Sequence, residues 1–309
     1  MFRGAYAQNR IAKTTTTLLQ LGISLGRGMI LAGIMFVILS PILSIISDAV
    51  MNEIDIFNPF VFMIPENFTL ENFRTAYRHL NYVSTLTTTL GLSLSAMVLQ
   101  VLVCSLTGYG FARFEFPGKN ILFGVVILSI VVPVQSYMVS LFTQFRFFGA
   151  FGWETNLLNT FYPVLIMSAL GVGLRSGLFI YIFRQFFKGL PKDLEEAALI
   201  DGAGWLRTYI VIMLPNAASA IITVSVFSFV WQYNDTFFAA MFMQQLNLLP
   251  VQLTALPGVL LQTAGTVPSS FVSLVVSAAI LLAVAPVVTL YFGIQRFFME
   301  GVERSGIVG

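Results

Sequence analysis

Few side chains in this 309-residue chain could perform chemistry. It holds one histidine, His79, and one cysteine, Cys104, so a His/Cys metal cluster and an internal disulfide are both excluded. A catalytic trio of serine, histidine and acid would have to use His79, at the edge of a long apolar run. The segment Gly118-Lys119-Asn120 does not complete a phosphate-binding Gly-x-x-x-x-Gly-Lys-Ser/Thr loop. We therefore expect no enzyme activity, metal or cofactor in this chain.

Two charged residues, Arg175 and Asp235, lie in or beside long apolar stretches, where an ionisable group is a functional candidate. Arg175 could bond the hydroxyls of a sugar, or it could instead pair with Asp235 or with backbone carbonyls. Trp231, Tyr233 and Asn234 combine aromatic faces that suit sugar rings with polar groups that suit hydroxyls. The alternative for this cluster is an aromatic belt at the membrane interface. These five residues are the candidate solute path.

The composition indicates which elements must position these residues. The chain is 57% hydrophobic and 10% charged, whereas soluble domains carry roughly 25% charged residues. Its net charge of +2 is too small to create a positive field that would attract the phosphate backbone of a nucleic acid. Apolar runs that reach the roughly 20 residues of a membrane span recur along the chain. We expect an all-α membrane protein with six transmembrane helices, near residues 28–47, 84–112, 120–144, 157–183, 215–242 and 270–294.

Residues 236–295 carry no charge and are too many for one crossing. Amides, prolines and glycines in the first half predict a non-spanning segment near 244–268. Twelve of the 16 Lys and Arg residues fall in the termini and the even-numbered loops, which places both termini in the cytoplasm. The cytoplasmic parts are then an N-terminal segment, 1–27, and a tail, 295–309, with loops between them.

One cytoplasmic loop, residues 185–214, is long enough to fold by itself. Pro191 suits a first helical position, and acids follow in the first turn. Asp201-Gly202 can end that helix, and a second helical stretch runs from Gly204 and stops at Pro215. Small residues around the turn would let another backbone approach closely: Ala197, Ala198, Ala203 and Gly204. The loop is either a docking hairpin or an amphipathic segment on lipid headgroups.

The segment Glu196-Ala197-Ala198-Leu199-Ile200-Asp201-Gly202, with Ile212-Met213-Leu214-Pro215 after it, resembles the EAA motif of binding-protein-dependent ABC importer permeases. Every fixed position of that motif is present at the right spacing. The resemblance implies a type I importer transmembrane domain, in which this hairpin docks on a separate ATPase. Glu196 would face a basic group on that ATPase. The turn would transmit the closing motion of the ATPase to the transmembrane helices. The ATPase-coupling residues are then Glu196, Ala197, Ala198, Asp201, Gly202, Leu214 and Pro215.

The stretch 108–118 and the tail Gln295-Arg296-Phe297-Phe298 resemble carbohydrate permeases of the maltose type, in the subunit with a short C-terminal tail. This resemblance implies a bacterial inner membrane location and a sugar or oligosaccharide solute. Peptide and polyol-phosphate solutes stay open. It also implies several partners: two copies of an ATP-binding cassette subunit that holds ATP and Mg²⁺, a related but non-identical second permease, and an extracytoplasmic solute-binding protein. The alternative function is an ion-coupled secondary carrier or channel, for which Asp235 is the sole carboxylate candidate.

Overall fold

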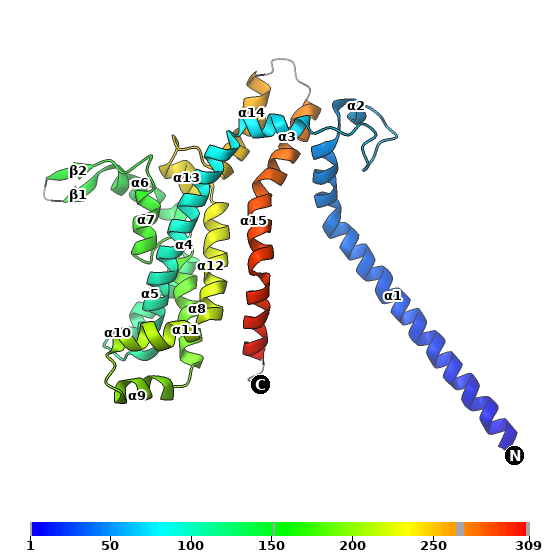
Figure 1. Cartoon of the computed structure of the whole chain (residues 1–309), viewed down its shortest axis with the longest axis horizontal. Helices are drawn as coiled ribbons and strands as arrows, with labels where there is room; N and C mark the ends of the chain where they lie inside the picture. The colour runs from blue at the N-terminus through cyan, green and yellow to red at the C-terminus, as the bar shows by residue number, and fades with distance from the viewer. Residues whose placement is uncertain (1, 151, 264–268, 307–309) are drawn as a thin grey trace. The chain divides into compact units, whose positions relative to one another are not determined.

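The computed structural model describes residues 2–150, 152–263 and 269–306. These residues are mostly helical, and they divide into two compact units. Unit 1 comprises residues 1–75 and 266–281, and unit 2 comprises residues 76–265 and 282–309. Figure 1 labels the helices and the two paired β-strands of these described residues. The candidate residues all belong to unit 2.

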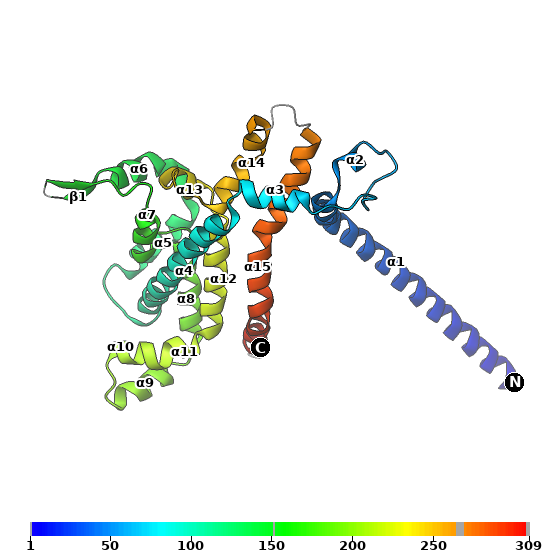
Figure 2. The same cartoon turned by 45° about the horizontal axis from the view of Figure 1, so that its top comes forward.

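Unit 2 is built around three helices that lie side by side in both cartoon views (Figures 1 and 2): α4 (Tyr82–Arg113), α8 (Ser176–Gly189) and α12 (Ala218–Tyr233). Gly108 of α4 permits the closest approach, because a Cβ there would lie 2.6 Å from the Phe183 Cβ and 2.9 Å from the Arg184 nitrogen. Aromatic side chains of α8 fill the interface, and Phe179, Phe183 and Phe187 are fully buried. Small residues therefore set the helix spacing, as is usual in membranes.

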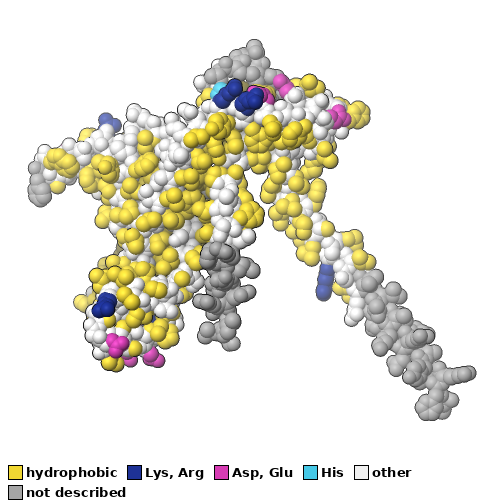
Figure 3. All heavy atoms as spheres, in the orientation of Figure 1, with side chains coloured by type: hydrophobic (Ala, Val, Ile, Leu, Met, Phe, Trp, Pro, Cys, Tyr) yellow, Lys and Arg dark blue, Asp and Glu magenta, His cyan; other side chains and the backbone are white. Residues whose placement is uncertain are grey.

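The other elements of unit 2 connect these helices. A 3₁₀ turn covers Val134–Tyr137, and the C-terminal part of α15 (Ser269–Gly306) also belongs to this unit. The remaining elements are α5 (Lys119–Val131), α6 (Met138–Arg146), β1 (Phe148–Ala150), β2 (Trp153–Thr155), α7 (Tyr162–Ala169), α9 (Asp193–Ile200), α10 (Trp205–Thr208), α11 (Leu214–Asn216), α13 (Phe237–Phe242) and α14 (Leu249–Thr263). Hydrophobic side chains cover much of the visible face of unit 2, as in a surface that faces lipid (Figure 3).

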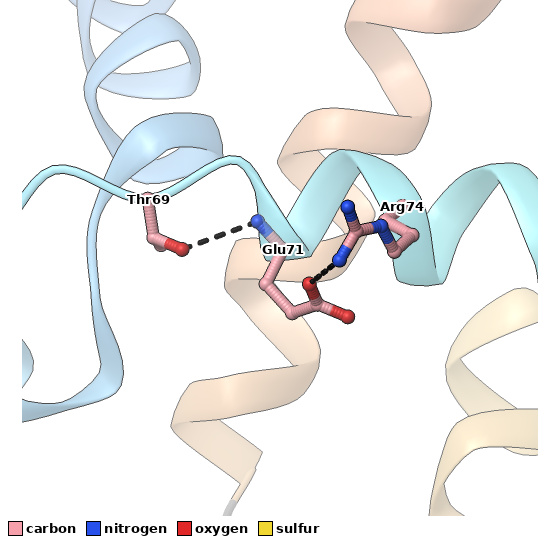
Figure 4. A network of polar contacts seen from close by, with 3 residues as sticks. All are labelled: Thr69, Glu71 and Arg74. Atoms are coloured by element: carbon pink, nitrogen blue, oxygen red, sulfur yellow. Dashed lines mark hydrogen bonds and ion pairs between the residues drawn. The ribbon is translucent and has the colours of Figure 1, made fainter.

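Unit 1 contains α1 (Phe2–Val50), α2 (Glu53–Ile56), the start of α3 (Glu71–His79) and the start of α15. Asp55 fixes the loop after α1, since it accepts bonds from the backbone and side-chain nitrogens of Asn67 at 2.8 and 2.6 Å. These bonds hold the pKa of the Asp55 carboxyl below its usual range. Thr69 caps α3 by accepting from the Glu71 nitrogen, and Arg74 pairs with the Glu71 carboxylate at 2.9 Å (Figure 4).

Three described helices are long and apolar enough to cross a membrane: Gly22–Val50, Tyr82–Arg113 and Ser270–Gln295. Two bent pairs raise the number to five if each is one span: residues 119–131 with 134–146, bent by 100°, and residues 205–216 with 218–233, bent by 79°. The first of these breaks falls inside the expected span 120–144. The structure thus has the helices of a multi-pass membrane protein, several of them discontinuous.

Three stretches differ from the continuous pattern that the sequence predicts. Residues 157–183 form two helices, α7 and α8, with a break at 170–175. Residues 215–242 are divided among α11, α12 and α13. Residues 244–268 contain α14, a 15-residue helix that includes Pro257, so the prolines and glycines there do not keep the segment from being helical.

Candidate functional site

The hairpin at 185–214 has a first helix, α9, that ends in a tight glycine turn. The Gly202 nitrogen donates to the Leu199 carbonyl at 3.1 Å, and the Ala203 nitrogen donates to the Ala198 carbonyl at 2.9 Å. Gly202 has a φ of +82°, which a residue with a side chain adopts at a cost of about 1–2 kcal/mol. This is the Schellman arrangement of a helix end. The turn at Asp201-Gly202 therefore lies where the sequence predicts it, while α9 begins at Asp193, two residues after Pro191.

The predicted coupling residues do not share one environment. Glu196, Ala197, Asp201 and Gly202 are exposed along the outer face of α9 and its turn, whereas Ala198 is buried against the protein. Acidic side chains are visible at this end of unit 2 in Figure 3. The outer face therefore presents two carboxylates, small residues and an open glycine to a partner outside the chain.

Beyond the turn, the second half of the hairpin is irregular. Residues Tyr209–Met213 form a π-helical segment between α10 and α11, and such segments are frequent at functional sites. Leu214 is half-buried and Pro215 is exposed. Pro215 was expected to stop the helix, but it lies in the first turn of α11. Backbone N–H groups in a first turn have no partner within the helix, so proline costs no hydrogen bond there.

Sequence reasoning missed the contact that holds the hairpin to the transmembrane helices. The Arg113 Nε lies 3.2 Å from the Glu195 Oε1, and both side chains are buried. The Arg113 Nη2 also donates to the Leu190 carbonyl at 2.8 Å. Arg113 belongs to the stretch that resembles maltose-type permeases and Glu195 to the acidic first turn, but no local pattern indicates that they meet.

The break between α7 and α8 is held by a buried amide from α4. The Gln100 Nε2 donates to the Leu174 carbonyl at 2.9 Å and to the Ser176 hydroxyl at 3.2 Å. The Ser228 hydroxyl of α12 donates to the Gln100 Oε1. A carbonyl freed at a helix break needs such a donor, because an unpaired polar group in apolar surroundings is costly. Gln100 therefore stabilises the break between α7 and α8, at which Arg175 lies.

Arg175 lies at that break, in the left-handed region with a φ of +61°. Its side chain is exposed, and its guanidinium carbon lies 5.5 Å from the ring centre of Trp231. The Trp231 ring is stacked on Phe179 at 5.7 Å and on Phe227 at 5.4 Å. The structure thus joins Arg175 and Trp231 in one aromatic and cationic cluster. No ion pair between Arg175 and Asp235 occurs in the part of the chain that the structure describes.

The other three solute-path candidates bond to backbone. The buried Tyr233 donates its hydroxyl to the Ala283 carbonyl at 2.8 Å. Asn234 is exposed, but its amide donates to the Val230 carbonyl at 2.8 Å. Asp235 accepts from the Phe238 nitrogen at 3.1 Å and from the Ala239 nitrogen at 3.2 Å, at the start of α13. Asn234 and Asp235 thus stabilise helix ends and Tyr233 joins α12 to the interior of α15, whereas Arg175 and Trp231 present groups suited to a solute.

Comparison with known proteins identifies the chain. The model of the family described as binding-protein-dependent transport system inner membrane component matches residues 100–304. The chain is 32% identical over 250 residues to the diacetylchitobiose uptake system permease protein NgcG of Streptomyces coelicolor, covering 79% of this chain and 76% of that protein. It is 34% identical over 183 residues to a probable ABC transporter permease protein of Pyrococcus horikoshii, covering 58% of this chain and 62% of that relative.

A solved structure has the same fold. A chain in the crystal structure of a bacterial ABC transporter involved in the import of the acidic polysaccharide alginate superposes with a TM-score of 0.73, at 19% identity, over 89% of this chain and 96% of that one. The fold, the hairpin and the family match therefore agree: the chain belongs to the inner membrane components of binding-protein-dependent transport systems, a family of transport permease subunits rather than enzymes.

Proposed function

We propose that this chain is one of two permease subunits of an ATP-driven importer for a sugar or oligosaccharide, and that its hairpin at 185–214 couples it to a separate ATPase. The observation that carries the proposal is the exposed face of α9, where Glu196, Ala197 and the open turn at Gly202 extend outward from a buried, ion-paired base. A surface of small residues and exposed carboxylates suits insertion into a cleft that carries a basic group.

The proposed topology has six spans, with both termini in the cytoplasm. Its support is the Lys and Arg bias of the loops together with the position of the hairpin, because a cytoplasmic ATPase can reach the hairpin only on that side. The five spans that the described helices allow become six if α7 and α8 are also counted as one broken span. The partners in this proposal are two ATP-binding cassette subunits, a related second permease and a solute-binding protein.

A sugar is the solute class that the relatives support. The Streptomyces permease is named for diacetylchitobiose uptake, and the solved transporter imports an acidic polysaccharide. The cluster of Arg175 and Trp231 offers an aromatic face and a planar group of donors, which together suit a sugar ring and its hydroxyls. The alternative of an ion-coupled carrier has no such support, because both named relatives are permeases of uptake or ABC systems.

Copurification from the native membrane tests this function. The solubilised complex should contain an ATPase, a second permease and a solute-binding protein, and in vesicles it should transport the ligand of that binding protein only when ATP is supplied. A chain that purifies alone and transports solute without ATP would contradict the proposal.

Replacing Trp231 by alanine tests the solute path. We expect the KM for transport to rise roughly two- to tenfold, because a stacked aromatic pair contributes about 0.5–1.5 kcal/mol beyond its buried area. Tyr233→Phe is the matched control, since the hydroxyl that it removes already bonds the Ala283 carbonyl and should not affect the KM. Equal KM values for the two variants would remove Trp231 from the path.

A further inference from the structure

The last turn of α4 contacts the hairpin at several successive points. Arg113 reaches the end of α8 through the Leu190 carbonyl at 2.8 Å and reaches α9 through the Glu195 carboxylate at 3.2 Å. The next residue, Phe114, packs edge-on against Trp205 at the start of α10, with ring centres 5.1 Å apart. One side of the helix end therefore contacts the hairpin before and after its glycine turn.

A second contact lies one helical turn earlier in α4. The Tyr109 ring lies 5.1 Å from the Tyr209 ring and 5.5 Å from the Phe187 ring. The Tyr209 hydroxyl in turn lies 2.7 Å from the Ser105 hydroxyl of α4. The π-helical segment of the hairpin is thus fixed to the same helix as α9.

The ion pair at the centre of these contacts is buried. The Arg113 side chain is 5% exposed and the Glu195 side chain 8%. Their facing atoms lie at ion-pair distance without the alignment of a hydrogen bond. Such a pair adds little net stability, because each ion loses its water, but it disfavours any arrangement that separates the charges. Its effect is therefore to fix where α9 lies on α4.

Adjacent acids on α9 have different environments. Glu195 is buried against Arg113, while Glu196 is exposed on the outer face. Successive residues of an α-helix point about 100° apart, so one short helix can present one carboxylate to α4 and the next one to a partner. This division assigns the two acids different tasks.

We propose that Glu195 and Arg113 are positioning residues that tie the coupling hairpin to α4, so that displacement of the hairpin moves this helix. The inference rests on the proposed function, in which a partner ATPase engages the outer face of α9. The helix α4 has 32 residues and packs on α7, α8 and α12. It also carries Gln100, which holds the α7 to α8 break beside Arg175. The link therefore connects the hairpin with the candidate solute site through one continuous helix.

Charge reversal tests the link. Three variants are compared with the natural protein: Arg113→Glu, Glu195→Arg and the double swap. Glu196→Arg is the matched control, because it makes the same change one residue further on, outside the buried pair. Spin labels at Leu106→Cys on α4 and Ile200→Cys on α9 report the position of the hairpin independently of ATP, since both native side chains are exposed and the native Cys104 is buried.

We expect each single reversal to broaden the distance distribution between the labels, and the swap to narrow it again. In the reconstituted complex, solute transported per ATP should fall roughly tenfold in each single variant and recover most of its value in the swap, within the range of coupling energies for residues in contact. Glu196→Arg should keep the distances narrow yet reduce transport per ATP.

Two results would separate the possible failures. Label distances that stay narrow in both single variants, or transport per ATP that falls in Glu196→Arg alone, would overturn the link and leave the proposed function standing. Transport per ATP that stays unchanged in every variant, including Glu196→Arg, would overturn the coupling role of the hairpin, and the positioning role with it.

Discussion

Transport is expected to fall by about thirtyfold or more when Gly202 is replaced by tryptophan, although the transmembrane helices stay folded. The turn at Gly202 is exposed, and nothing lies within 4 Å of a Cβ built there, so the indole fits the isolated chain. It would instead occupy the space into which a docking cleft must close. Loss of a central interface contact typically costs about 2 kcal/mol or more. ATP-dependent uptake, measured in vesicles beside basal ATP hydrolysis, is the readout.

The chain offers a matched control for the backbone strain. Gly118, in the turn before α5, has the same φ of +82° and the same open space around its Cβ, so Gly118→Trp introduces equal strain and equal bulk at a residue outside the hairpin. Gly202→Asn, which tolerates a positive φ, should keep most of the transport. If Gly202→Trp and Gly118→Trp transport equally well, the turn is not a docking surface.

Local chemistry explains why the hairpin could be predicted from the sequence. A helix end that needs a positive φ selects glycine, so Asp201-Gly202 indicates the turn by itself. Pro191 likewise predicts the start of α9 to within two residues, and the acids that follow it do lie in the first turn. The division of the neighbouring acids could not be predicted, because the burial of Glu195 depends on Arg113, which lies some 80 residues away in the chain.

The breaks within the expected spans could not be predicted, for a similar reason. Gly171 and Gly173 could equally be read as packing residues of one continuous helix. The break there depends on the Gln100 amide, which lies 74 residues from the carbonyl that it satisfies. Hydropathy therefore identifies the apolar length of a span but not its continuity. Pro257 is the opposite case, since it lies inside α14 although proline predicts a break.

The structure brings two of the five candidate solute-path residues, Arg175 and Trp231, into contact. Arg175 and Trp231 are 56 residues apart in the chain, yet they meet because α8 begins at the break and α12 packs beside it. Tyr233 and Asp235, which are close to Trp231 in sequence, instead bond backbone groups, Tyr233 in the interior of α15 and Asp235 at the start of α13. Adjacency in the sequence was therefore a poor guide to which of these side chains meet.

Gly108→Ala is expected to destabilise the fold of unit 2 by about 3 kcal/mol, the upper end of the usual cost of overpacking. The new methyl carbon would lie 2.6 Å from the Phe183 Cβ and 2.9 Å from the Arg184 backbone nitrogen. Neither atom is the end of a flexible side chain, so α4 and α8 would have to separate along their interface. Cys104 reports this unfolding, because it is buried between the same helices, with its sulfur 3.7 Å from the Ser176 carbonyl oxygen.

The measurement is the temperature at which a thiol-reactive dye gains access to Cys104 in detergent, and a shift of roughly 5–10 °C downward is expected for Gly108→Ala. Gly91→Ala provides the matched control, since Gly91 lies in the same helix with nothing within 4 Å of a built Cβ. That substitution should leave the transition unchanged or raise it, because alanine favours a helix by up to about 1 kcal/mol over glycine. Equal transitions for the two variants would mean that α4 and α8 do not approach each other at Gly108, and the position of Arg113 beside the hairpin, one turn further along the same helix, would lose its support.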